Sequence, residues 1–395
     1  MTHDRFIQIH FLTSYSATLL NRDDAGMAKR LPFGGSTRTR VSSQCLKRHW
    51  RTADDSHALA HLDGVEMSLR SRLIFSEKVA RPLIEQEGLD REKVEAAVAA
   101  FQSLLLGSSA RAQKEKAKKG ETATDLQTSQ VVVLGWPEIR FIQEKVRTIV
   151  SQSAGAEAAG KAVGAFSNDE KKNMKKLIDA CDLKAGLDAA LFGRMVTSDI
   201  LSRLDAAIHV AHAFTVHAQE LETDYFSALD DLLQASGKLG SGHINDSELT
   251  SGLFYGYVVV DLPLLVTNLS DDRALAAQVV GSLIHLIATV SPGAKKGATA
   301  PYAYAEMVLV ESGNRQPRTL ANAFRKAVPL GGPGDVREVA MAQLGEYLQQ
   351  CDAMYGCGEV RKVVAMGDTA SLAAESAPGL EALVAWVGDR VRGVA

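Results

Sequence analysis

The chain has 395 residues, of which 46% are apolar and 23% charged, and its net charge is −3. This composition is that of an ordinary globular protein with two or three folding units, and it excludes a uniformly basic nucleic-acid binder. No run approaches the roughly 18 consecutive apolar residues of a membrane helix, and the N-terminus lacks the apolar core of a signal peptide. The four cysteines form no CxxC pair, so we expect a cytoplasmic protein with reduced thiols.

The chain is expected to open with a strand over residues 5–12, because Ile7, Ile9 and Phe11 alternate with side chains of the opposite face. A loop over residues 13–41, rich in Gly, Asp and Arg, follows this strand. Ser42 or Ser43 then caps a helix that runs to residue 53.

The middle of the chain, residues 56–190, is expected to be largely helical. Its clearest helix has apolar residues at helical spacing from Val94 to Leu105 and stops at Gly107. Residues 107–130 have almost no apolar side chains and are predicted to form a polar, mobile insertion.

Strand character returns at residues 206–217, 253–261 and 305–311, with an apolar helix expected at 271–290 and a terminal helix at 381–391. Without the helical insertion, the order strand–helix–strand–strand–helix–strand predicts an α+β fold of the ferredoxin-like type. Such a sheet leaves one face open, and RNA-recognition domains use that face. Because fold alone does not decide function, the candidate sites must.

The strongest compositional feature is a segment over residues 25–53 that contains basic residues and no carboxylate. It also contains Gly34-Gly35 and several hydroxyl residues before the expected helix start. Exposed N–H groups, hydroxyl donors and the positive end of a helix are what phosphate oxygens need, so this acid-free segment predicts a phosphate-binding surface. Its basic residues are Lys29, Arg30, Arg38, Arg40, Lys47, Arg48 and Arg51.

Two other sets of residues resemble functional motifs. Lys295 and Lys296 form a second basic loop, but the GxxxxGK[ST] spacing of a nucleotide-binding loop is absent, so an NTPase is not expected. His209 and His217 would stand about 26 Å apart on one strand, and His212 would face the other way. We therefore expect ordinary strand histidines and no metal site.

Several positions allow two interpretations. Asp23 and Asp24 could bind a divalent ion or act as acid and base, although such residues in a loop more often form turns. The segments Tyr225-Phe226 and Gly193-Arg194-Met195 could stack on bases or pack locally. The lysines at residues 171–176 are by default a solvated helix face.

Taken together, these motifs resemble the CasC backbone subunits of type I-E CRISPR Cascade. The similarity begins with Asn21-Arg22-Asp23-Asp24, Phe33-Gly34-Gly35 and residues 40–48, where Cys45 replaces a small polar residue. It continues in order at residues 193–195, 211–213, 226, 230–231, 251–252, 292–295 and 321–324. It covers most of the chain and is weakest at residues 107–130 and in the C-terminal ~40 residues.

The resemblance implies a ferredoxin-like palm at residues 1–55 and 191–395, helical fingers at 56–190 and a β-hairpin thumb at 218–251. Copies would stack head to tail in a helical filament along the CRISPR guide RNA, together with other Cascade subunits, and the guide would pair with target DNA. No catalysis and no cofactor are expected. With the basic loops included, RNA contacts are expected at Arg22, Lys29, Arg38, Arg40, Ser42, Gln44, Lys47, Arg48, Arg51, Arg194, Met195, Tyr225, Phe226, Lys295 and Lys296. Target-DNA contacts are expected at Lys171, Lys172, Lys175 and Lys176.

Two other functions stay open. One is a metal-dependent endonuclease that cuts target RNA with Asp23 or Asp24. The other is a guide-processing ribonuclease with a histidine base, which the scattered histidines disfavour. The scaffold hypothesis fits best, because a protein that holds any guide must contact phosphate and sugar and leave the base edges free.

Overall fold

The computed structural model describes residues 4–106, 126–165, 185–195, 201, 203–229 and 241–393, with the backbone alone at 226–229 and 241–245. The chain divides into two compact units. The first, which we call the sheet unit, comprises Met1–His61, Ile208–Leu262 and Ala274–Ala395. The second, the helical unit, comprises Leu62–Ala207 and Pro263–Arg273. None of the described helices is long and apolar enough to cross a bilayer.

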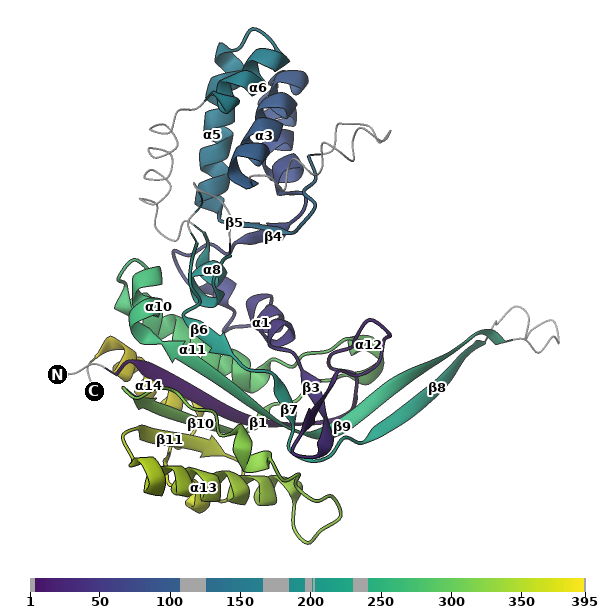
Figure 1. The fold of residues 1–395 in the computed structure, drawn as a ribbon, viewed down its shortest axis with the longest axis vertical. Helices are drawn as coiled ribbons and strands as arrows, with labels where there is room; N and C mark the ends of the chain where they lie inside the picture. The colour runs from purple at the N-terminus through teal and green to yellow at the C-terminus, as the bar shows by residue number, and fades with distance from the viewer. Residues whose placement is uncertain are drawn as a thin grey trace. The chain divides into compact units, whose positions relative to one another are not determined.

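The sheet unit is built on one large mixed sheet, whose strand order is β12-β11-β10-β1-β9-β7-β3-β2, with β6 and β8 also pairing with β9 (Figure 1). The central strand β1 runs antiparallel to both neighbours, and Ile9 lies opposite Val258 of β9 and Val310 of β10. The strands are β1 (Phe6–Thr18), β2 (Arg30–Phe33), β3 (Ser36–Val41), β6 (Ile208–Val210), β7 (Ala213–Thr215), β8 (Leu221–Leu229), β9 (Ser241–Asp261), β10 (Ala305–Gly313), β11 (Val360–Ala365) and β12 (Glu375–Ser376).

The predicted alternation of β1 is confirmed, because its side chains enter two different cores. Phe11 faces α1 and α11 on one side of the sheet, whereas Leu12 joins the core beneath α13 on the other side. The helices and helical turns of this unit are α1 (Ser43–Arg51), η1 (Leu59–His61), α11 (Arg273–Thr289), α12 (Lys296–Thr299), η3 (Ala321–Phe324), α13 (Val336–Tyr355), η4 (Ala370–Leu372) and α14 (Leu380–Arg392).

The prediction that one sheet face is open is wrong. Ala340, Leu344 and Leu348 of α13 are fully buried against the side of the sheet that carries Leu12 and Tyr255. Figure 1 shows α13 lying along β10 and β11. The C-terminal third of the chain therefore supplies a helix and an added strand that cover the face, because burying that apolar surface is favourable.

The predicted loop at residues 13–41 contains a β-hairpin, which the sequence analysis missed. Strands β2 and β3 pair from Arg30↔Thr39 to Phe33↔Ser36, which leaves a two-residue turn of Gly34 and Gly35. Both glycines have positive φ angles, 60° and 81°, as the hairpin turns that match strand twist require. A Cβ at Gly34 would also lie 1.6 Å from the carbonyl oxygen of Arg325. Both the positive φ angle and the lack of space therefore require glycine at this position.

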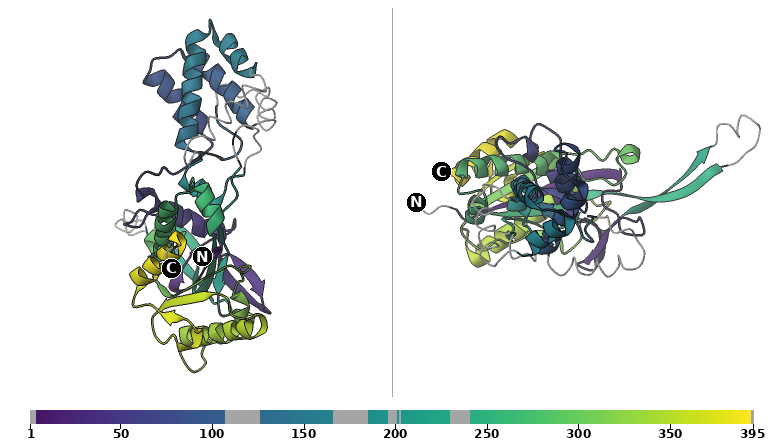
Figure 2. Two further views of the ribbon diagram at one scale, coloured as in Figure 1. Left: turned by 90° about the vertical axis from the view of Figure 1, so that its left-hand side faces the viewer. Right: turned by 90° about the horizontal axis from the view of Figure 1, so that it is seen from above.

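Two more strand predictions are refined. The strand expected at residues 206–217 is two short strands, β6 and β7, separated at Ala211 and His212. Strand β9 begins well before residue 253 and pairs antiparallel with β8 from Leu221↔Thr250 to Leu229↔Ser241. Together β8 and β9 form a long two-stranded ribbon that leaves the sheet (Figures 1 and 2).

The helical unit is held by its own apolar core, to which Phe75, Val98, Phe101, Ile139 and Val146 contribute. The helix predicted from the spacing of apolar residues between Val94 and Leu105 is confirmed as α3, and a short β4–β5 pair was missed. The described elements associated with this unit are β4 (Leu69–Ser71), the π-helical turn η2 (Ile74–Ala80), α2 (Arg81–Glu85), α3 (Arg91–Leu106), β5 (Val132–Leu134), α5 (Trp136–Gln152), α6 (Ala156–Gly164), α8 (Leu187–Phe192) and α10 (Leu262–Asn268).

Candidate nucleic-acid interface

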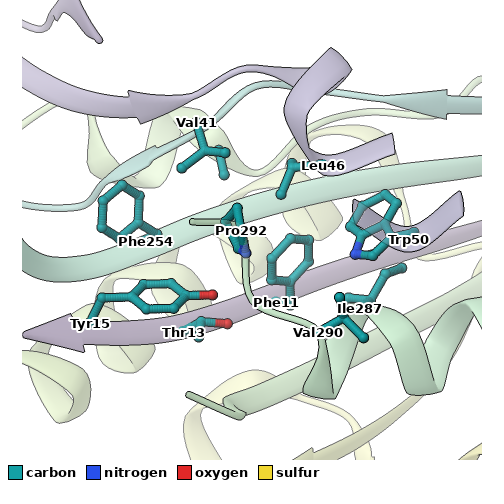
Figure 3. Close-up of a pocket in the computed structure, with 11 residues that line it drawn as sticks. Phe11, Thr13, Tyr15, Val41, Leu46, Trp50, Phe254, Ile287, Val290 and Pro292 are labelled. Atoms are coloured by element: carbon teal, nitrogen blue, oxygen red, sulfur yellow. The ribbon is translucent and has the colours of Figure 1, made fainter. Parts of the chain in front are cut away.

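Helix α1 is anchored to the sheet by its apolar side. Leu46 and Trp50 are buried and line an apolar pocket with Phe11 of β1 and with Ile287 and Val290 at the end of α11 (Figure 3). The remaining sides of the helix carry its polar residues. The packing therefore fixes the direction in which the basic residues of α1 point.

The N-terminal turn of α1 is built from three separate segments. The Ser42 side chain caps the helix by accepting from the Cys45 N–H at 3.3 Å. The Asn21 side chain accepts from the Ser42 N–H at 2.9 Å, and Nδ1 of His212 accepts from the Ser43 N–H at 3.0 Å. No acidic residue lies in this turn, so the positive end of the helix dipole is left available to an anion.

The charges of several basic residues act on the titratable groups around this turn. Burial and the charges of Arg40 and Lys29 lower the pKa of His212. Burial raises the pKa of the Cys45 thiol, and the charges of Lys29 and Arg48 oppose that shift.

A fourth cation comes from the second basic loop. Burial lowers the pKa of His49, a backbone hydrogen bond opposes this, and the charges of Lys296 and Arg48 lower it further. Electrostatic effects of this kind are felt only at short range. We call Lys29, Arg40, Arg48, Lys296 and the N-terminal turn of α1 the cationic cradle.

The other predicted RNA contacts near α1 differ in accessibility. Arg22, Gln44 and Arg48 are exposed, and Lys47, Arg51 and Lys295 are half-buried. Ser42 is buried, and its hydroxyl is used as the helix cap. The structure thus brings most of the predicted set together around one helix start.

Arg38 is different, although it belongs to the same segment. It is fully buried, and its guanidinium donates to the carbonyl oxygens of Thr215 and Phe324 at 3.0 and 2.9 Å. It cannot reach a phosphate in this arrangement, because the backbone groups that it satisfies enclose it. Arg38 therefore holds the β2–β3 hairpin against the sheet, contrary to the prediction of an RNA contact.

A carboxylate from outside the acid-free segment pairs with one of its basic residues, which the sequence of the segment does not indicate. Glu248, from the distant strand β9, forms an ion pair with Arg30 and accepts from the Ala28 N–H. Nearby, the Asp23 carboxylate accepts from the N–H groups of Ala25 and Met27, both at 3.0 Å. Asp23 is thus a turn residue here.

In the helical unit, Arg194 forms a buried ion pair with Glu138, with N–O distances of 2.6 and 2.8 Å. Both side chains are almost completely buried, so the prediction that Arg194 contacts a nucleotide is at odds with this structure. A buried charge needs its partner, and the pair joins the segment after α8 to the start of α5. The neighbouring Met195 is 88% exposed and keeps an accessible apolar side chain.

On the β8–β9 ribbon, Tyr225 is 67% exposed, so its ring is not local core. Side chains at residues 226–245, including Phe226, lie outside the described residues. The predicted DNA-binding residues Lys171, Lys172, Lys175 and Lys176 also lie outside them.

His212 is the residue that sequence reasoning missed. It was interpreted as an ordinary strand histidine, but it lies in the break between β6 and β7 and is exposed. Because its Nδ1 accepts from Ser43, the neutral ring carries its proton on Nε2. The ring can therefore donate a hydrogen bond from within the cationic cradle. In the sequence, only its place in the Ala211-His212-Ala213 motif could have indicated that His212 lies at the cradle.

Comparison with known proteins places this arrangement in a class. The chain resembles a solved chain of a "CRISPR RNA-guided surveillance complex, pre-nicking", with 27% identity and a TM-score of 0.77 over 98% of this chain and 100% of that chain. A chain of a "CRISPR RNA-guided surveillance complex" shares the fold at 22% identity and a TM-score of 0.57, over 97% and 99% of the two chains. The fold is thus that of the backbone subunits of such complexes.

The model of the CT1975-like protein family matches residues 7–386. The chain therefore belongs to this family, the CasC backbone subunits of type I-E Cascade, as the sequence resemblance predicted. It is a backbone subunit of a CRISPR RNA-guided surveillance complex. No curated protein matches the chain.

Proposed function

We propose that this backbone subunit is a non-catalytic scaffold that holds the guide RNA by its sugar–phosphate chain, with the cationic cradle as the contact surface. The observation that carries the proposal is the convergence of Lys29, Arg40, Arg48 and Lys296 on a helix N-terminus without acidic residues. Guanidinium and ammonium groups at the positive end of a helix recognise phosphate oxygens, and phosphate contacts carry no base sequence information.

The cradle suits a protein that must hold any guide sequence. Arg48 is exposed on α1, and His212, whose Nδ1 accepts from the Ser43 N–H at the helix start, is free to donate from Nε2. The backbone of α1 is held by the packing of Leu46 and Trp50 and the His212 ring by its bond to Ser43, so less order has to be gained when RNA binds. Phosphate contact leaves the base edges of the guide free to pair with target DNA.

The sheet topology supports a ferredoxin-like palm within the sheet unit. The strands β10, β1, β9 and β7 are neighbours in that order, and α1 and α11 are the two intervening helices. This is the split β-α-β arrangement. With both faces covered, we propose that RNA lies at the edge where α1 begins and not on an open sheet face.

The β8–β9 ribbon corresponds to the proposed thumb. The exposed Tyr225 can stack on a displaced nucleotide, since stacking tolerates any base. In the proposed helical filament, copies of the chain repeat along the guide, so each thumb would meet the guide at a regular interval. Contacts of the fingers with target DNA stay a proposal drawn from the resemblance.

The hydrogen bonds of Asp23 support a non-catalytic role. Oδ1 of Asp23 already accepts two backbone N–H groups, which is the role of a turn residue. Cleavage of guide-paired RNA in the presence of Mg²⁺, lost on Asp23→Ala, would favour the endonuclease alternative instead.

The test of the scaffold is the double variant Lys47→Ala/Arg48→Ala. Removing two phosphate contacts should weaken binding of unrelated single-stranded RNAs equally, and it should flatten the slope of log K against log salt by about 1.4. Fluorescence anisotropy over a salt titration measures both quantities.

A matched control is Lys362→Ala/Arg392→Ala, which removes one half-buried and one exposed cation that pair with Glu375 and Asp389. Its affinity and salt slope should stay near those of the unaltered protein. Equal behaviour of the two double variants would contradict the cradle as the RNA-binding surface.

A further inference from the structure

Away from the cradle, two imidazoles and a carboxylate lie close together within the sheet unit. They are His57 in the loop after α1, His285 in α11 and Glu381 in the first turn of α14. One ligand atom from each lies within 4.8 Å of the other two, and Nε2 of His285 is 3.4 Å from Oε1 of Glu381. Among the described residues, this is the group of three or more His, Cys, Asp or Glu side chains that could hold a metal ion.

The ligand set fits a borderline transition metal. Zinc takes imidazole nitrogen and carboxylate oxygen at about 2.0–2.2 Å, and a tetrahedral site with such bonds places neighbouring ligand atoms about 3.3 Å apart. The separation of His285 and Glu381 already has this value. A further carboxylate, Asp55, accepts from the backbone N–H of His57 at 2.8 Å.

The rings of His57 and His285 are stacked, with centroids 3.6 Å apart and an angle of 10° between the planes. One ion cannot lie in the planes of two parallel rings, because ring lone pairs point along those planes. Metal binding therefore requires one ring to leave the stack. His57 is half-buried on a loop, so it can turn, whereas His285 is held within α11.

We propose that His57, His285 and Glu381 form a zinc-class metal site, with a water molecule completing the coordination. The bound ion would join the loop that follows α1 to α11 and α14. Because these three elements are far apart in the sequence, such a link would favour the folded sheet unit over the unfolded chain.

The experiment uses untagged full-length protein, cleared of metal by a chelator and titrated with Zn²⁺ by calorimetry. We expect one equivalent to bind, a rise in Tm, and a change in the ring signals of His57 and His285 by NMR as the stack opens. His285→Gln and Glu381→Gln should each weaken this binding by more than about tenfold.

The matched control is His61→Gln. His61 is an exposed histidine of the same unit whose ring pairs with the single carboxylate of Asp54 at 3.7 Å. It should leave the stoichiometry and affinity unchanged. Zinc binding that is equally weak in the unaltered protein, the control and both site variants would overturn the proposal. The cradle residues are not involved, so that result would leave the RNA-binding proposal standing.

Discussion

The sheet unit uses arginine in two opposite ways, in the cationic cradle and in a buried ionic network beneath α13. In the network, Arg318 and Arg361 both bond to Glu311, with N–O distances of 2.6 to 3.1 Å. Nε2 of His10 lies 3.1 Å from the same carboxylate, and Nδ1 lies 2.8 Å from the Tyr255 hydroxyl. His10 and Glu311 are completely buried.

The difference follows from solvation. Burial raises the pKa of Glu311, but the hydrogen bonds from His10 and Arg318 and the charge of Arg318 outweigh it, so the net pKa is lowered and the carboxylate stays ionised. Buried charges persist only when they are paired, whereas exposed cations are stabilised by water until a ligand replaces it. The network therefore contributes to folding, and the cradle is kept for binding.

The largest effect is expected from a variant that breaks the network. Glu311→Ala removes the buried carboxylate that His10, Arg318 and Arg361 share, although Arg361 keeps its pair with Asp352. We expect unfolding to cost about 3–5 kcal/mol less. Urea denaturation measures this loss.

The surface variant Glu375→Ala, which breaks only an exposed pair with Lys362, should cost less than about 1 kcal/mol. Refolded Glu311→Ala should bind RNA with unchanged affinity. Equal losses of stability in the two variants, or a loss of RNA binding in Glu311→Ala, would show that network and cradle do not have separate roles.

A smaller effect is expected in the cradle. His212→Ala removes one hydrogen-bond donor, so RNA affinity should fall about fivefold, or about 1 kcal/mol, with little change in stability. Anisotropy titration measures the affinity, and His212→Gln, which can donate from a similar position, should recover part of it. His209→Ala, on the neighbouring strand β6, should have no effect. Should His209→Ala weaken binding as much, the assigned role of His212 would be wrong.

The smallest expected effect is a difference between the pH dependence of stability and that of RNA affinity. Burial lowers the pKa of His10, with the hydrogen bond and charge of Glu311 opposing. Below the ordinary value of about 6.5 the unfolded chain then takes up a proton that the folded chain does not. Stability should therefore fall as the pH drops below about 6.5, and His10→Gln should reduce that slope. His10 is not part of the cradle, so RNA affinity should not fall over the same pH range. A parallel decline of both quantities would show that network and cradle are coupled.

Local patterns in the chain predicted much of this protein. The alternation of Ile7, Ile9 and Phe11 predicted β1, and the spacing from Val94 to Leu105 predicted α3, because each pattern is complete within one element. The acid-free segment before and within α1 predicted the place of the cradle, since seven cations and a helix start lie close together in sequence. The motif set as a whole predicted the family.

Tertiary structure alone decided which of those residues are accessible and what opposes them. Arg38 and Arg194 are buried by partners 56 to 286 residues away, Glu248 reaches Arg30 across 218 residues, and α13 closes the face predicted to be open. His212, His57, His285 and Glu381 likewise acquire their settings from segments far apart in sequence. Local periodicity reports which way a side chain points, whereas burial and charge pairing depend on which distant element lies opposite, and only the packed fold determines that.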